Sequence, residues 1–172
     1  AVINTGEQPF QAYARLISIL GDQLISDKWV GVIELVKNCY DADAENVYVR
    51  FLNFENPTKQ NPATIEIEDT GVGMTLNTIL TVWMKPATPN KLNQKKSAEQ
   101  RFTDKGRVMQ GDKGVGRFAI YKLGDHVEVY TKTKESNEIK LTLNFHDYAD
   151  DTFEESNHTD RFLDEILNTW EE

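Results

Sequence analysis

The chain has 172 residues, a net charge of −9 at pH 7 and 39% hydrophobic residues. This length and composition fit one globular domain and exclude a disordered or fibrous protein. The acidic excess argues against a surface that binds nucleic acid over its whole area, and no apolar run approaches the roughly 20 residues that span a bilayer. We therefore expect a cytoplasmic protein without a membrane partner.

The first part of the chain predicts an irregular arm and two helices. Residues 1–9 carry no periodic pattern, whereas apolar residues recur at helical spacing from Phe10 to Leu24 and predict a first amphipathic helix. Ser26 or Asp27 is suited to cap a second helix, which is expected to run to about Tyr40.

Two short strands and a long basic segment follow. Alternation predicts strands over 46–53 and 64–68, joined by the polar turn 56–63 into an antiparallel hairpin. Thr75 is suited to cap a short helix that ends near Trp83. Residues 85–110 lack a hydrophobic period and are rich in Lys and Arg: nine of the 19 basic residues lie between Lys85 and Arg117. A solvated loop and a local site for a polyanion both fit this segment.

The last part predicts a helix, a second hairpin and a closing helix. Residues 111–116 open a helix that Gly124 ends, and residues 126–131 and 138–145 alternate as strands. An acidic stretch after residue 146 is expected to lead into a helix capped by Thr159. The whole order predicts one domain of the α+β class, a two-layer sandwich with helices on one face of a mainly antiparallel sheet.

The second helix carries a narrow polar stripe on a mostly apolar surface. At 100° per residue, Glu34, Asn38 and Asp41 fall within roughly 60° of one another. Two carboxylates and an amide on short side chains suit a metal ion, a water molecule or a polar ligand. Cys39 lies on the opposite, apolar arc, and we expect a buried thiol in a reducing compartment.

Two glycine-rich stretches follow the stripe. In the first, Asp69 ends a strand and precedes Gly71 and Gly73; such a pattern forms either a plain tight turn or a carboxylate displayed beside a flat ligand. The second is GDKGVGR at 111–117, which offers backbone N–H groups at a helix N-terminus, as a phosphate requires. It fits neither the dinucleotide fingerprint nor the P-loop, which requires Lys where Asp112 stands. One cysteine and three scattered histidines do not predict a zinc site.

Together these stretches closely resemble the GHKL ATPase superfamily, which has the Bergerat ATP-binding fold. The resemblance rests on Glu34-x-x-x-Asn38-x-x-Asp41-Ala42, then Asp69-x-Gly71-x-Gly73, then Gly111-x-x-Gly114-x-Gly116. The superfamily includes gyrase B subunits, ninety-kilodalton heat-shock chaperones, histidine kinases and MutL. The resemblance spans about residues 10–145. It implies a Mg²⁺-dependent ATP-binding domain that is the N-terminal part of a larger protein.

The resemblance also implies a role for each matched residue. Glu34 would be the general base for water attack, Asn38 would bind Mg²⁺, Asp41 would support the sugar or phosphate side, and Asp69 would accept the adenine amino hydrogen. Gly71, Gly73 and Met74 would lie near the base. Residues 85–110 would belong to a mobile lid. The phosphates would be covered by Gly111, Lys113, Gly114, Val115, Gly116, Arg117 and Phe118.

The resemblance implies that a glutamate at position 34 accompanies water attack, which favours the hydrolytic branch of this superfamily. A histidine kinase would also need a histidine that accepts the phosphoryl group, and no histidine precedes His126. The expected function is ATP hydrolysis to ADP and phosphate, slow in this domain alone, with lid closure and ATP-dependent homodimerisation of a larger protein. Nucleic acid or a client protein would bind through further domains. The alternatives are a non-catalytic nucleotide-binding domain and a phosphotransfer domain.

Overall fold

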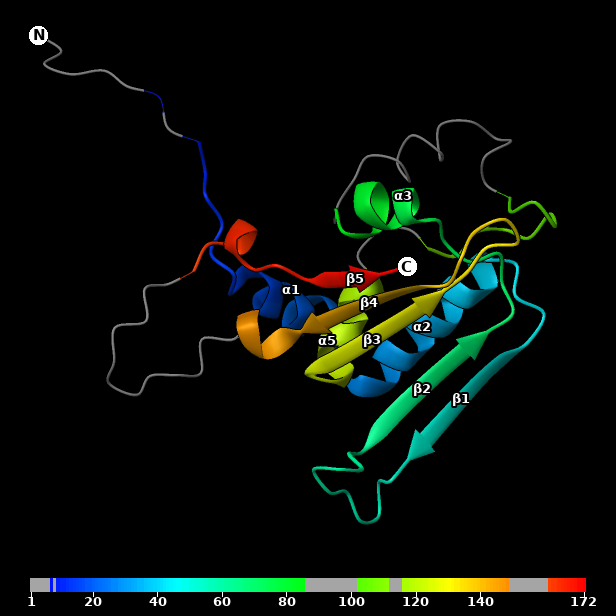
Figure 1. Ribbon diagram of the computed structural model, residues 1–172, viewed down its shortest axis with the longest axis horizontal. Helices are drawn as coiled ribbons and strands as arrows, with labels where there is room; N and C mark the ends of the chain where they lie inside the picture. The colour runs from blue at the N-terminus through cyan, green and yellow to red at the C-terminus, as the bar shows by residue number, and fades with distance from the viewer. Residues whose placement is uncertain (1–6, 8, 86–101, 112–115, 149–160) are drawn as a thin grey trace, which may run out of the picture.

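The computed structural model describes residues 7, 9–85, 102–111, 116–148 and 161–172 (Figure 1). Its class is α+β, as predicted, and all its strand pairs are antiparallel. The strands form a two-stranded sheet and a three-stranded sheet rather than one continuous sheet. Within the described ranges, no helix has the length and apolar character needed to cross a membrane.

Helix α1, Leu16–Leu24, begins later than the hydrophobic spacing predicts. Tyr13 instead forms an antiparallel bridge with Phe162 in the C-terminal part of the chain, and Ala14 and Arg15 turn into the helix. Ala14 N–H donates to Arg161 O (2.9 Å), Leu163 N–H donates to Ala12 O (2.8 Å), and the ring of Tyr13 stacks on that of Phe162. The helical prediction for 10–15 is therefore wrong, since a distant segment supplies the hydrogen bonds that a helix would have made.

Helix α2, Lys28–Asp41, begins and ends close to the predicted residues. Asp27 is the cap, because its Oδ1 accepts a hydrogen bond from Val30 N–H (3.0 Å). Gly31 lets the helix approach α5, Ala119–Leu123, closely: a Cβ there would lie 3.3 Å from Leu123 side-chain atoms. This contact brings the segment before α5 over the polar stripe of α2.

The first hairpin is formed by β1, Val47–Leu52, and β2, Thr64–Asp69, as predicted. After β2, Thr75 caps the short helix α3, Leu76–Thr78, which continues as a π-helical turn over Ile79–Trp83. The short helix and its end are confirmed. Asp69 is thereby held at the end of a paired strand, directly before the turn that carries Gly71 and Gly73.

The second sheet contains β3, His126–Thr131, and β4, Ile139–Asn144, with a third strand β5, Thr169–Glu171. The predicted closing helix is wrong: within 161–172 the chain makes only a 3₁₀ turn at Leu163–Glu165 and then β5. The open edge of β4 offers backbone hydrogen bonds to β5, with Leu141 opposite Trp170. Thr159, the proposed cap, lies outside the described residues.

The core lies between β4 and the helices on one side of this sheet (Figure 1). The inward residues of β4 alternate along the strand, and two of them, Ile139 and Leu141, are almost completely buried. They pack with Ile17 of α1, Phe118 and other buried residues, in the two-layer arrangement that the sequence predicts.

The two sheets meet where the turn after β2 contacts the end of β3. Met74 N–H donates to Thr131 Oγ1 (2.8 Å), and Gly73 has φ +71° with its α-carbon against Lys132. A Cβ on Gly73 would lie 2.0 Å from the backbone oxygen of Lys132. No side chain fits there without separating the two segments.

We expect Gly73→Ala to lower the free energy of unfolding by about 3 kcal/mol or more, because it combines backbone strain with a backbone clash. Gly106→Ala is a matched control: Gly106 has φ +78°, but a Cβ added there would have no other atom within 4 Å. That variant carries the strain alone, about 1–2 kcal/mol. Urea unfolding measures both, and equal losses in the two variants would show that the contact with Lys132 is unimportant.

Candidate functional site

The middle of α2 faces the segment that enters α5. A Cβ on Gly116 would lie 3.4 Å from Glu34 Oε2 and 3.7 Å from both Asn38 Oδ1 and Nδ2. Gly116 begins a 3₁₀ turn, Gly116–Phe118, that leads into α5. The structure thus brings Gly116, the last glycine of the third motif, next to Glu34 and Asn38, which precede it by 82 and 78 positions in the chain.

The two carboxylate oxygens of Glu34 have different neighbours. Its Oε1 accepts a hydrogen bond from Lys37 Nζ at 2.7 Å, while Oε2 is the oxygen beneath Gly116. The Glu34 and Lys37 side chains are 28% and 35% exposed, so this pair contributes at most about 1 kcal/mol to stability. Its main effect is to orient the carboxylate.

Asp41 lies at the end of α2 and binds the beginning of the glycine-rich stretch. Its Oδ1 accepts from Gln110 N–H (2.6 Å) and its Oδ2 accepts from Gly111 N–H (2.7 Å). Both carboxylate oxygens therefore hold the backbone. The polar stripe of α2 is thus in contact with the segment at two points, near Gly111 and near Gly116.

The Asp69 turn packs against the residue after Asp41. Gly71 N–H donates to Asp69 Oδ1 (2.7 Å) and Val72 N–H donates to Ala42 O (2.9 Å). A Cβ on Gly71 would lie 2.7 Å from Ala42 O, so this turn requires the close approach that glycine allows. The Asp69 carboxylate remains exposed beside the end of α2.

Other predicted site residues lie in different settings. Met74 is half-buried and packs against the core, and Phe118 is 7% exposed within it, so Phe118 offers a ligand only its backbone. Lys113, Gly114 and Val115 lie outside the described residues, as does the side chain of Arg117. Of the predicted lid 85–110, residues 86–101 lie outside them too.

Sequence reasoning missed Asp43, a buried carboxylate two positions after Asp41. It accepts hydrogen bonds from the Thr103 hydroxyl and from Lys105 N–H. Burial alone would raise the pKa of Asp43, but these hydrogen bonds and the charges of Arg107 and Lys105 outweigh it and lower the pKa. The sequence offered only two signals for Asp43: a further carboxylate shortly after Asp41 and, later in the chain, an unusually basic loop.

Cys39 is buried on α2, as predicted, and its thiol donates to Leu35 O. Burial, followed by the charge of Asp69 and a hydrogen bond with it, raises the pKa of Cys39 to about 12. Asp69 and the apolar side of α2 are therefore close in space.

The raised pKa predicts a pH dependence of stability. The folded state binds the thiol proton more tightly than the unfolded state, so the contribution is complete below pH 9.0 and is lost as the pH rises toward 12. We expect the free energy of unfolding to fall between about pH 8 and about pH 10.5, and to fall less in Cys39→Ala. Urea unfolding at the two pH values measures this. An equal fall in both proteins would contradict it.

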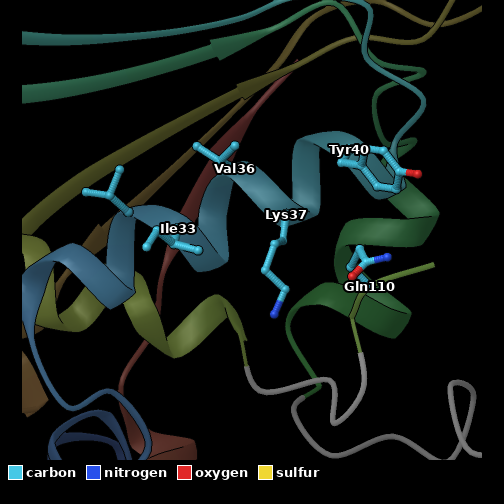
Figure 2. Close-up of a pocket in the computed structure, with 6 residues that line it drawn as sticks. Ile33, Val36, Lys37, Tyr40 and Gln110 are labelled. Carbon is cyan, nitrogen blue, oxygen red and sulfur yellow. The ribbon is translucent and has the colours of Figure 1, made fainter. Parts of the chain in front are cut away.

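A separate pocket lies on the flank of α2 (Figure 2). It is lined by Val32, Ile33, Val36, Lys37, Tyr40 and Gln110. The apolar arc of α2 is therefore only partly covered: Ile33 is 57% exposed and Trp29 is 69% exposed. This pocket borders the polar stripe through Lys37, whose Nζ binds Glu34.

The structure gathers several polar groups along one face of α2. There is a carboxylate, an amide, a glycine backbone above them, and a further exposed carboxylate at the end of β2. Within the described ranges, no three His, Cys, Asp or Glu side chains gather to hold a metal ion.

Comparison with known proteins also indicates an ATPase family. Residues 25–169 match the family described as histidine kinase-, DNA gyrase B-, and HSP90-like ATPase. The chain is similar to a mitochondrial 75 kDa heat shock protein of Bos taurus (28% identity over 141 residues, 76% of this chain and 20% of that protein). It is also similar to the chaperone HtpG of Oceanobacillus iheyensis (26% over 155 residues, 77% and 23%).

A third relative is a putative type II restriction enzyme, HgiDII, of Herpetosiphon aurantiacus, which is 29% identical over 99 residues. That match covers 58% of this chain and 14% of the relative. The chain spans less than a quarter of the length of each of these three relatives. Because the family match covers most of the chain, the protein belongs to the histidine kinase-, DNA gyrase B- and HSP90-like ATPase family.

Proposed function

We propose that this chain is a Mg²⁺-dependent ATP-binding and ATP-hydrolysing domain. The observation that carries the proposal is the position of Gly116 directly above Glu34 and Asn38. The Gly116 backbone, the Glu34 carboxylate and the Asn38 amide would then line one phosphate site. A carboxylate, an amide and a glycine backbone are groups that a phosphoryl-transfer site can use.

The described residues would then share the reaction as follows. Glu34 Oε2 would accept the proton of the attacking water, while Lys37 keeps Oε1 oriented. Asn38 would provide a hard oxygen ligand to Mg²⁺, which when bound neutralises phosphate charge. Asp69 would accept the adenine amino hydrogen, with Gly71, Gly73 and Met74 beside the base.

The covering residues 111–118 would close over the phosphates, held at one end by Asp41. We further propose that the domain is one part of a larger, cytoplasmic protein in which ATP drives lid closure and homodimerisation. A client protein or nucleic acid would bind to other domains of that protein. The restriction enzyme and chaperone names of the relatives are both consistent with such an arrangement.

Calorimetric titration of ATP with and without Mg²⁺, followed by phosphate release in the full-length protein, tests the proposal. We expect Mg²⁺-dependent binding and slow turnover. Binding without turnover would favour the non-catalytic alternative, and label transfer from γ-³²P-ATP to protein would favour phosphotransfer. No binding of ATP or ADP would overturn the proposal.

A further inference from the structure

Asp43 has an unusual backbone and an unusual environment for a carboxylate. Its φ is +59°, a left-handed conformation that costs a non-glycine residue roughly 1 kcal/mol or more. Its side chain is only 4% exposed, and burying a carboxylate is unfavourable unless it is fully paired. Both costs need compensation by specific contacts.

The compensating contacts all come from one turn in the basic loop. The Thr103 hydroxyl donates to Asp43 Oδ1, Lys105 N–H donates to Oδ2 (3.1 Å), and Arg107 Nε lies 3.9 Å from Oδ1. Within the turn, Arg107 N–H donates to Thr103 Oγ1 (3.1 Å). The turn is therefore folded around the carboxylate. We name Asp43, Thr103, Lys105 and Arg107 the Asp43 clamp.

Arg107 fastens the same turn to the end of α2 and to the residues that follow it. Its Nη1 donates to Ala44 O (2.7 Å), and its guanidinium lies 5.1 Å from the centre of the Tyr40 ring. Removal of Asp43 would thus weaken the attachment without detaching the turn. This predicts a graded change in the position and freedom of the loop rather than its release.

The clamp leads directly to the covering segment of the site. Three residues after Arg107, Gln110 and then Gly111 donate their N–H groups to Asp41. Asp41 ends α2 and Asp43 lies in the turn that follows it, so two carboxylates hold the loop at two successive places. When Asp43 already holds residues 103–107, less conformational entropy is lost when Asp41 binds Gln110 and Gly111 and when a ligand binds.

We propose that Asp43 is a positioning residue of the nucleotide site, which holds residues 103–107 so that Gln110 and Gly111 stay bound to Asp41 at the end of the polar stripe. The inference rests on the proposed function and adds to it a residue that touches neither nucleotide nor Mg²⁺. Because the clamp acts before the chemical step, it raises nucleotide affinity and leaves the rate of hydrolysis in the bound state unchanged.

The test is Asp43→Gly in the full-length protein. Glycine accepts φ +59° without strain, which offsets part of the lost contacts and keeps the domain folded. We expect the Kd for ATP and the KM to rise about tenfold, with kcat within about twofold of the wild type. Hydrogen exchange of the Lys105 amide, whose N–H binds Asp43 Oδ2, should become at least about tenfold faster.

Asn53→Gly is the matched control. Asn53 also has φ +59°, and it lies after β1 on the exposed hairpin loop, where its side chain binds Pro62 O. This variant relieves the same strain away from the clamp, so Kd and KM should not change. Thr103→Val removes the hydroxyl bound to Asp43 and should raise Kd in the same direction. Because Thr103 Oγ1 also accepts from Arg107 N–H, the double variant with Asp43→Gly should raise Kd further, but by less than the product of the two single effects.

An unchanged Kd in a folded Asp43→Gly protein would overturn the inference, as would a fall in kcat at unchanged KM. Failure of the proposed function has a different signature, because the wild-type protein would then bind neither ATP nor ADP. If the wild type binds ATP and Asp69→Asn does not, but Asp43→Gly binds normally, the nucleotide site is upheld and the clamp is rejected.

Discussion

Glu34→Gln is expected to reduce ATP hydrolysis by about 100-fold to 10,000-fold, the usual contribution of a general base. Glutamine has the shape of glutamate but cannot accept the proton of an attacking water. The Lys37 ammonium can still donate to the amide oxygen, so the orientation of the side chain is retained. ATP binding should therefore remain within a few-fold of the wild type, and phosphate release together with calorimetry measures both quantities.

Glu66→Gln is the control for this substitution. Glu66 is a 47% exposed acid on β2, 3.6 Å from Arg50 Nη1, and its replacement should leave turnover unchanged. Wild-type turnover in Glu34→Gln would mean that another group accepts the proton. Loss of ATP binding in the same variant would assign Glu34 to ligand binding instead.

Asp69→Asn is expected to weaken ATP and ADP binding by about 100-fold or more. The carboxylate only accepts hydrogen bonds: Oδ1 already accepts from Gly71 N–H, and the group is proposed to accept the adenine amino hydrogen as well. Asparagine keeps one acceptor oxygen, which the turn requires, and directs its NH₂ group toward the base. A donor facing a donor costs most of the affinity of such a site. Calorimetric titration measures the change.

Glu68→Gln provides the matched control, because Glu68 precedes Asp69 on β2 and is bound to Arg50 on the strand's exposed side. We expect it to bind ATP as the wild type does. If Asp69→Asn bound ATP with unchanged affinity while remaining folded, the adenine would not be recognised at this end of β2.

Local sequence signals determined most of the central elements. The cap at Asp27 and the polar stripe together predict α2, and simple alternation predicts β1, β2, β3 and β4, because each signal concerns neighbours in the chain. The three motifs also predict the family, which the comparison confirms. The individual roles of Glu34, Asn38 and Asp69 stay predictions.

Tertiary structure decided the features that depend on distant partners. The beginning of α1 and the formation of β5 were mispredicted because residues 161–163 pair with residues 12–14 and because β4 offers an open edge. Apolar spacing at these ends is compatible with helix and strand alike, and the available backbone partners decide between them.

Asp43 illustrates the same limit within the site. From the sequence, it is one more acidic residue between a helix and a strand. Only the folded chain brings Thr103, Lys105 and Arg107 around its carboxylate, 60 or more positions away. The sequence by itself therefore determined which residues are candidates for the site, whereas the packing of the basic loop against the end of α2 decided how Gln110 and Gly111 are held, because those contacts exist only after the chain has folded.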